Sequence, residues 1–197
     1  MPTWTFVRHG QSVSNVEGWL AGQYDSPLTR HGEAQAVAAR DSLPQPVPPR
    51  AFCSDLTRAH HTAKLLLQGH ATPLVVTPKL RERGLGAWRR RTVAGLREQE
   101  LDHLKSWRGQ PPGGESLFDV AQRVAAWATS VDDSSQPTLV VAHGGLMKAI
   151  FAALDGLPRD QLDRGHPDNC QAVQRDIPVG RWAEVLDELR REATQPA

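Results

Sequence analysis

The chain alternates between short apolar runs and longer stretches in which apolar residues recur every three or four positions. The short runs are rich in β-branched and aromatic residues, as in TWTFV at residues 3–7, and predict buried strands. The longer stretches predict helices, and the clearest of them presents Trp127 to the core. This alternation predicts an α/β fold with a mostly parallel sheet. Strands are expected at residues 3–7, 50–53, 74–77, 138–145 and, at an edge, 170–174, and helices at residues 30–43, 54–67, 92–107, 117–131, 146–154 and 182–191.

The segments between these elements carry loop and capping signals. Residues 11–22 contain glycines and have no sustained period, so we expect a loop that lies over the end of the first strand. The proline-rich residues 44–49 are expected to form an extended connector, and residues 108–115 and 159–169 to be irregular. Hydroxyl or carboxyl side chains precede three of the helices as candidate N-caps: Thr29, Ser54 or Asp55, and Ser116 together with Asp119.

The composition is typical of a soluble globular protein. The chain has 197 residues, of which 39% are hydrophobic and 23% charged, and this suits one domain over residues 1–197. The net charge of +1 gives no support for nucleic-acid or membrane binding, and no leader or spanning run is apparent, so we expect a cytoplasmic protein. Cys53 and Cys170 are too few and too far apart for a disulfide framework or a thiolate metal site. The sequence leaves open whether the protein is a monomer or a homodimer.

Two of the predicted strands end in a histidine followed by glycine. His9 follows the first strand and stands beside Arg8, and His143 follows a later one. Because the carboxyl ends of neighbouring parallel strands meet at one edge of a sheet, both histidines are expected to face one small ligand there. A single histidine in such a place is more often structural, but the repeated context favours a functional site. The adjacent His60 and His61 would point in different directions from a helix, and we interpret them as structural.

Charged residues after two other strands supply further parts of phosphate chemistry. Arg58 lies near the start of the helix at 54–67, where free amides, the helix dipole and a guanidinium all favour an anion. Glu82 follows the strand at 74–77, and a carboxyl group there can give a proton to a departing alkoxide if burial raises its pKa, whereas the surrounding arginines would lower that pKa. The simpler interpretations are a surface ion pair for Arg58 and pairing of Glu82 with the arginine on either side of it. Together with two histidines, these residues can bind a phosphate, attack it and protonate its leaving group, and which histidine attacks is open at this point.

Several separated motifs resemble those of the histidine phosphatase superfamily, the phosphoglycerate-mutase-like enzymes. The resemblance begins with Arg8-His9-Gly10 followed by Asn15, and it runs from residue 3 to about residue 170. Further matches are D-x-P-L-T at 25–29, S-x-x-x-R-A-x-x-T-A at 54–63, L-x-E-x-x-x-G-x-W at 80–88 and P-x-G-E-S within 111–116. The resemblance implies a three-layer α/β/α sandwich of the phosphoglycerate mutase-like type, with a mostly parallel central sheet and helices on both faces.

The resemblance also implies a role for each site residue. The RHG histidine is the one that is phosphorylated in the family, so His9 is the expected nucleophile and Glu82 the expected general acid. The implied catalytic residues are His9, Glu82 and His143, and the implied phosphate-binding residues are Arg8, Asn15, Arg58 and Gly144. The implied activity is that of a histidine acid phosphatase-type hydrolase, which cleaves a small phosphorylated metabolite through a phosphohistidine intermediate. No cofactor and no metal are expected.

The chain departs from the family pattern after Trp88, where relatives commonly have glutamate and glycine and this chain has Arg89, Arg90 and Arg91. Such a run is usually a solvated face; the alternative is a rim that attracts a substrate with extra negative charge. A phosphoglycerate mutase is the close rival, but such mutases are usually longer and have tryptophan and asparagine where this chain has Val13-Ser14-Asn15. A noncatalytic phosphate-binding module is the rival from another class. Ribazole phosphatases and phosphatases of sugar phosphates or phosphoglycerate derivatives remain alternatives within the main interpretation.

Overall fold

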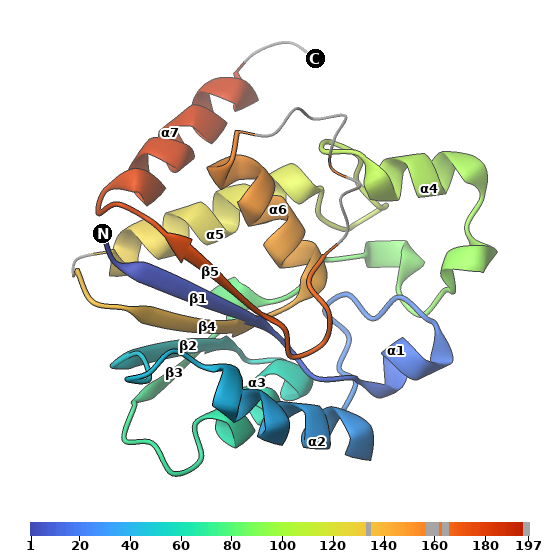
Figure 1. Cartoon of the computed structure of the whole chain (residues 1–197). Coiled ribbons are helices and arrows are strands. Elements are labelled where there is room, and N and C mark those ends of the chain that lie inside the picture. The colour runs from blue at the N-terminus through green and yellow to red at the C-terminus, as the bar shows by residue number, and fades with distance from the viewer. Residues whose placement is uncertain (133–134, 157–161, 163–165, 195–197) are drawn as a thin grey trace.

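The computed structural model describes residues 1–132, 135–156, 162 and 166–194. A five-stranded sheet crosses the centre of the molecule in the order β3-β2-β4-β1-β5 (Figure 1). The strands are β1 (Thr3–Arg8), β2 (Arg50–Ser54), β3 (Leu74–Thr77), β4 (Thr138–Ala142) and β5 (Ala172–Asp176). The first four are parallel, and β5 pairs antiparallel with β1 at one edge. The prediction of a mostly parallel sheet with a late edge strand is confirmed.

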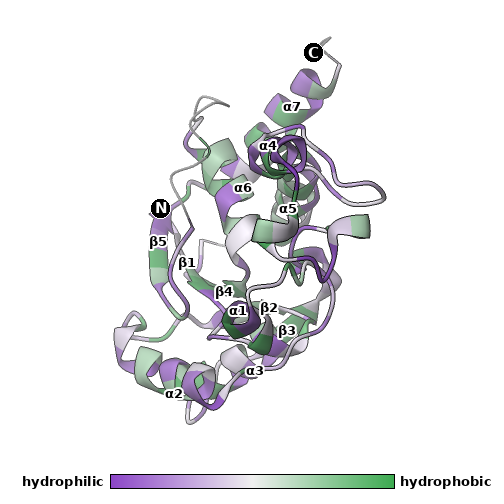
Figure 2. Ribbon diagram, turned by 90° about the vertical axis from the view of Figure 1, so that its right-hand side faces the viewer, coloured by the Kyte–Doolittle hydropathy of each residue, from purple (hydrophilic) through white to green (hydrophobic). Residues whose placement is uncertain are grey.

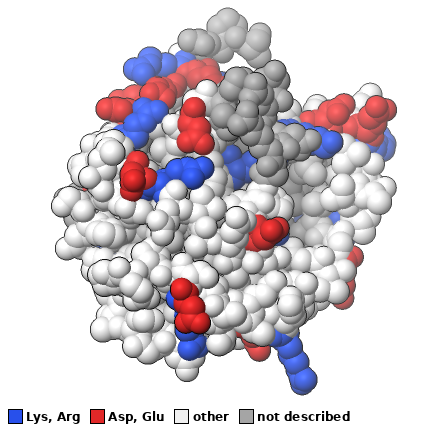
Figure 3. Space-filling view, in the orientation of Figure 1, with Lys and Arg blue, Asp and Glu red and all other residues white. Residues whose placement is uncertain are grey.

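Helices cover both faces of this sheet and form the predicted three-layer α/β/α sandwich. They are α1 (Val13–Glu17), α2 (Arg30–Ala38), α3 (Thr57–Leu66), α4 (Glu98–Lys105), α5 (Leu117–Val131), α6 (Gly144–Leu154) and α7 (Arg181–Ala193). α5, α6 and α7 lie on one face of the sheet and α2 and α3 on the other (Figures 1 and 2). α1 and α4 lie on the side of the molecule where the parallel strands end. On the face shown in Figure 3, charges of both signs are mixed over α7 and α4.

Each face of the sheet has its own hydrophobic core. Successive residues of β1 point to opposite faces, so Trp4 and Phe6 pack beneath α5, α6 and α7, while Val7 packs with Leu66 of α3. Trp127 is buried as predicted, and its ring meets Trp4 edge-on with the centroids 6.3 Å apart. β4 is buried along its whole length because helices cover both of its faces.

The connections that leave β1 and β4 go to opposite faces of the sheet. From β1 the chain passes to α2 on one face, and from β4 it passes directly into α6 on the other. The last residues of these parallel neighbours, Arg8 and Ala142, are paired in register. Open α/β sheets bind ligands in the crevice that such a reversal creates at the carboxyl ends of the strands. His9 and His143, the next residue after each strand, therefore emerge side by side.

Several predicted segments differ from the structure. The strand predicted at 138–145 ends at Ala142, and Gly144 already begins α6. The end of the helix predicted at 30–43 is a 3₁₀ turn at Ala39–Ser42. Residues 11–22 contain the helix α1 as well as loop, because the side chain of Asn15 accepts the backbone N–H of Ser12 and caps a helical turn. The helix predicted at 92–107 is divided into a 3₁₀ turn at Val93–Gly95 and α4, with a glycine at the break. The irregular segment predicted at 159–169 lies largely outside the described residues.

The predicted helix caps are only partly right. The hydroxyl groups of Thr29 and Ser116 cap α2 and α5 as predicted. The prediction for α3 is wrong, because neither Ser54 nor Asp55 caps it, and the carboxylate of Asp55 is bound by a downstream arginine. Asp25 serves this helix instead, since its carboxylate accepts the backbone N–H of the first helical residue at 3.0 Å. A cap contributed from another loop is not visible as a local pattern.

Candidate active site

A cavity of about 280 Å³ lies at the carboxyl ends of β1 and β4. Its wall combines charged groups from the sheet edge with apolar side chains from the surrounding segments. All the predicted site residues except His143 line this cavity: Arg8, His9, Asn15, Arg58, Glu82 and Gly144. Four further polar residues of the wall are not among the predicted ones: Ser14, Arg83, Lys148 and His166. The fold thus brings four widely separated motifs to one small volume.

Hydrogen bonds from three directions hold the backbone at His9. Its N–H donates to the carbonyl of Ala142 on β4 at 3.0 Å, and its carbonyl accepts from the side-chain amide of Asn169 at 2.8 Å. The N–H of Gly10 donates to the hydroxyl of Thr62 on α3 at 3.0 Å. The turn at His9 is therefore fixed to the neighbouring strand, to α3 and to the loop before β5 before any ligand binds.

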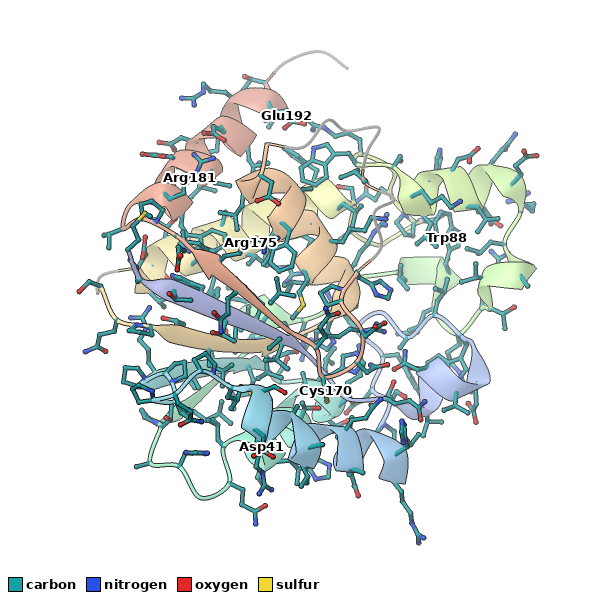
Figure 4. The ribbon with its side chains drawn as sticks, viewed as in Figure 1. Asp41, Trp88, Cys170, Arg175, Arg181 and Glu192 are labelled. Atoms are coloured by element: carbon teal, nitrogen blue, oxygen red, sulfur yellow. The ribbon has the colours of Figure 1, made fainter. Side chains whose placement is uncertain are left out.

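Close backbone packing surrounds the same turn. A Cβ atom on Gly10 would lie 2.4 Å from the carbonyl oxygen of Gly32, so only glycine fits there. Cys170, labelled in Figure 4, donates its backbone N–H to the carbonyl of Arg8 at 2.9 Å. Burial raises the pKa of the Cys170 thiol to about 11 and that of Cys53 to about 12. Neither thiol is thus set up as a nucleophile near neutral pH.

The two ring nitrogens of His9 have distinct partners. Nδ1 lies 2.7 Å from the carbonyl oxygen of Gly10, which can only accept, so this nitrogen carries the proton. Nε2 accepts from Nε of Arg58 at 3.3 Å, so it bears the lone pair. Burial and the charge of Arg58 lower the pKa of His9 well below its usual value of 6.5. The ring is therefore neutral at pH 7, with its nucleophilic nitrogen on the side of Arg58.

His143 lies behind His9 rather than on the cavity wall. It is completely buried, and its ring centroid is 5.1 Å from that of His9. Neither ring nitrogen has a hydrogen-bond partner among the described residues. Burial and the charge of Arg58 also lower the pKa of His143 well below 6.5. A second neutral imidazole thus packs directly against the first.

Arg58 is one of three arginines, with Arg8 and Arg83, that line the cavity and give it positive charge. It is almost fully buried, and it donates to the carbonyls of Gly22 at 2.7 Å and Tyr24 at 3.1 Å. Burial lowers the pKa of this guanidinium, while the carboxylates of Glu82 and Asp25 raise it. An arginine remains charged in proteins, so Arg58 is a fixed cation held between α3 and the 22–25 loop.

Arg8 is the second cation, and it leads to a residue that the sequence did not single out. Its Nη1 donates to the carbonyl of Pro167 at 2.9 Å and lies 3.0 Å from Nδ1 of His166. Its Nε is buried and has no partner among the described residues. His166 sits close to Gly144, where an added Cβ would lie 3.0 Å from the imidazole ring. His166 stands in a polar stretch with no strand or helix signal before it, so no local pattern marks it as a site residue.

Glu82 belongs to the segment after β3, and its carboxylate lies at the N-terminus of α6. Its carboxylate accepts the backbone N–H groups of Gly145 at 3.0 Å and Leu146 at 2.9 Å, as well as that of Arg83 at 2.8 Å. Carboxylates are favoured at a helix N-terminus by the free amides and the helix dipole. A Cβ on Gly145 would approach Oε1 of Glu82 to 2.6 Å, so glycine is required for this contact. The simpler interpretation, pairing with a neighbouring arginine side chain, does not hold, since these side chains bind other groups.

A half-buried clamp positions the segment that carries Glu82. Glu115 accepts the backbone N–H of Gly84 at 2.7 Å and the side-chain amide of Gln23 at 3.0 Å, and Gln23 also donates to the carbonyl of Glu82 at 3.0 Å. Arg123 of α5 binds Glu115 at 2.9 Å and donates to the carbonyl of Lys79 at 2.7 Å. The glutamate of the P-x-G-E-S motif thus supports the loop that carries Glu82.

Asn15 and the arginine run have local partners. Oδ1 of Asn15 accepts from Ser12, which leaves its NH₂ group to donate into the cavity. Arg91 binds the carboxylate of Glu100 through two hydrogen bonds, and Arg89 and Arg90 lie over the ring of Tyr24 at 5.6 and 5.5 Å. None of the three arginines is among the described residues that line the cavity.

In residues 1–132, 135–156, 162 and 166–194, no three histidine, cysteine or carboxylate side chains are grouped closely enough to hold a metal ion.

Comparison with known proteins places these features in a family. The sequence profile of the histidine phosphatase superfamily (branch 1) matches residues 4–188. The chain is 32% identical over 163 residues to the adenosylcobalamin/alpha-ribazole phosphatase of Salmonella typhimurium, which covers 79% of this chain and 81% of that protein. It is 30% identical over 214 residues to a probable phosphoglycerate mutase, GpmB, of Escherichia fergusonii, covering 94% and 97%. A structure of mycobacterial glucosyl-3-phosphoglycerate phosphatase with VO3 superimposes with a TM-score of 0.82 at 34% identity, covering 88% of this chain and 92% of that one.

Proposed function

The chain belongs to the histidine phosphatase superfamily, and we propose that it is a phosphatase that hydrolyses monoesters of small phosphorylated metabolites. One observation supports this most strongly. The unprotonated Nε2 of His9 lies in a cavity whose wall also contains the guanidinium groups of Arg8 and Arg58 and the carboxyl group of Glu82. These are the nucleophile, the fixed positive charge and the acid that cleavage of a phosphate ester requires.

In the first proposed step, Nε2 of His9 attacks phosphorus. The N–P bond forms while the P–O bond to the leaving alcohol breaks, and Glu82 gives a proton to the departing oxygen. Arg8 and Arg58 stabilise the charge on the nonbridging oxygens, with Asn15 as a further donor and Gly144 at the adjoining start of α6. The bond from Nδ1 of His9 to the carbonyl of Gly10 keeps the ring in the attacking tautomer.

In the second proposed step, water attacks the phosphohistidine. Glu82 takes a proton from the water, the N–P bond breaks, and inorganic phosphate leaves with the histidine restored. His143, which lies 5.1 Å behind His9 between ring centroids, keeps the nucleophile in place and contributes unpartnered nitrogens to the phosphate environment. His9 is the better candidate for attack, because His143 is completely buried and is not part of the cavity wall.

We expect this chemistry to need no metal or other cofactor. Two guanidinium groups already supply positive charge, and both oxygens of Glu82 are engaged by N–H donors. The lowered pKa of His9 keeps the nucleophile neutral below pH 6.5, which suits a phosphatase of the acid type.

No helix in the described residues is long and apolar enough to cross a bilayer. A cytoplasmic enzyme of one domain that binds neither nucleic acid nor membrane remains our proposal.

The test is phosphate release from a panel of phosphomonoesters in EDTA by the wild type and by His9→Ala. We expect release that survives EDTA and is lost in the variant, together with an acid-labile phosphoenzyme in rapidly quenched wild type. Equal release by both proteins would contradict the assignment of His9. Loss of release in EDTA that added metal restores would contradict the metal-free mechanism.

The same panel distinguishes the rival functions. A mutase is the alternative supported by similarity to probable phosphoglycerate mutases, and it would interconvert 2- and 3-phosphoglycerate faster than it releases phosphate. A noncatalytic module would bind phosphate or phosphoesters without releasing or transferring the phosphoryl group. Comparison of isomerisation, release and binding in one preparation therefore separates all three.

A further inference from the structure

The cavity that contains His9 also has an extended apolar side. Six side chains from loops and helices outside the sheet form it, and we call them the apolar wall: Trp19, Leu20, Ala21, Leu85, Leu104 and Leu117. Leu85 and Leu117 are buried, and the other four are half-buried. A ligand whose phosphate reaches His9 within the same cavity would bring the rest of the molecule against this surface.

Backbone hydrogen bonds fix the first part of the apolar wall. Leu20 donates its N–H to the carbonyl of Arg91 at 2.8 Å, and its own carbonyl accepts the N–H of Arg90 at 2.8 Å. The adjoining Gly22 packs so closely on Leu85 that an added Cβ would lie 3.0 Å from the Leu85 side chain. This part of the wall is therefore formed before a ligand binds, which lowers the entropic cost of binding.

The arginine run connects this part of the wall to α4. The guanidinium of Arg91 binds both carboxylate oxygens of the buried Glu100, at 2.8 and 3.0 Å. Leu104 lies four residues after Glu100, on the same side of the helix. The carbonyl of Leu104 in turn accepts from Arg83, the residue after Glu82, at 2.7 Å. From the run that the sequence offered as a rim for acidic substrates, the side chain of Arg91 thus holds an apolar surface in place, whereas the side chains of Arg89 and Arg90 lie over Tyr24.

We propose that the apolar wall binds the leaving group, so that the preferred substrates are phosphate monoesters of alcohols bearing an apolar ring or chain. This inference rests on the proposed phosphatase function. A hydrocarbon group gains free energy when it leaves water for such a surface. Hydroxyl or carboxylate groups placed there would lose hydrogen bonds to water without replacement. Hydroxy-acid and sugar phosphates are accordingly poorer substrates.

Four esters of primary alcohols test this preference while keeping the leaving oxygen similar: 2-phenylethyl phosphate, hexyl phosphate, 3-phosphoglycerate and glucose 6-phosphate. We expect kcat/KM to be about tenfold or more higher for the two apolar esters than for the other two. A higher kcat/KM for 3-phosphoglycerate or glucose 6-phosphate would overturn the inference. Absence of phosphate release from every ester would instead count against the phosphatase function itself.

Substitutions in the apolar wall test whether this wall causes the preference for apolar leaving groups. Leu104→Ala should lower kcat/KM for 2-phenylethyl phosphate by roughly tenfold and change glucose 6-phosphate little, and Leu20→Ala gives the same test if the first variant folds poorly. The matched control is the double variant Arg89→Gln/Arg90→Gln, which should leave all four values unchanged. A selective loss for 3-phosphoglycerate in that control would show that the arginines bind an acidic leaving group. Equal losses for all esters in both leucine variants would also overturn the proposal.

Discussion

Arg58 donates a hydrogen bond to the nitrogen of His9 that we expect to attack phosphorus, with 3.3 Å between Nε and Nε2. The guanidinium of the same arginine lines the cavity and is a strong donor for a phosphate oxygen. A bound phosphate would therefore draw this donor toward its oxygens and release the lone pair of the histidine. In the free protein, Arg58 holds the imidazole neutral and oriented, and in the complex it is placed to bind the group that the imidazole attacks.

This relationship predicts how Arg58→Ala changes the pH profile. Arg58 is the second cause, after burial, of the lowered pKa of His9, so its removal should raise that pKa toward 6.5. The acid limb of kcat/KM should thus move to higher pH, in addition to a loss of activity of about 100-fold or more at neutral pH. Measurement of kcat/KM between pH 4 and 8 tests this, with the exposed Arg30→Ala as control. An acid limb that stays in place would show that Arg58 does not set the pKa.

The sequence was informative where function depends on local pattern. The strand before His9, its glycine turn and the repeated context at His143 predicted both the sheet edge and the pairing of the histidines, since a buried strand fixes where its last residue emerges. The partners of Glu82 were not predictable in this way, because they come from the start of α6. Arg91 illustrates the same limit: its charge suggested solvent or substrate, and the structure gives it Glu100, a partner on a separate helix.

Gly145→Ala should show the role of Glu82 as proton donor to the leaving group separately from any effect on substrate binding. The added Cβ would meet Oε1 of Glu82 at 2.6 Å and displace the carboxylate from the helix terminus. We expect a loss of about 100-fold in kcat for alkyl phosphates and a much smaller loss for p-nitrophenyl phosphate, whose leaving group needs no acid. Glu82→Gln should give the same dependence on the leaving group. Gly95→Ala, where the Cβ meets only the hydroxyl of Thr92, is the matched control; equal losses for both substrates in Gly145→Ala would contradict this assignment.

Glu115→Gln tests the clamp behind Glu82. The substitution removes the charge that binds Arg123, so the loop from Lys79 to Gly84 should lose its fixed position. We expect kcat for alkyl phosphates to fall about tenfold with KM nearly unchanged, because small displacements of a catalytic group are costly. A double-mutant cycle with Glu82→Gln provides the decisive comparison: if Glu115 acts through Glu82, the second substitution adds no further loss. Additive losses would assign Glu115 an independent, purely structural effect.

The two buried histidines should also make folding stability depend on pH. Their pKa values in the folded protein are lowered, so the unfolded chain binds more protons once the pH falls through 6.5. The free energy of unfolding should therefore be flat with respect to these groups above that pH. Below it, the free energy should decrease by up to about 1.4 kcal/mol per pH unit for each histidine until the folded pKa is reached. Urea unfolding between pH 5 and 8 measures this slope. His143→Asn should make it shallower, and the half-exposed His61→Asn should not; a wild-type slope unaffected by His143→Asn would mean that other groups control the acid sensitivity.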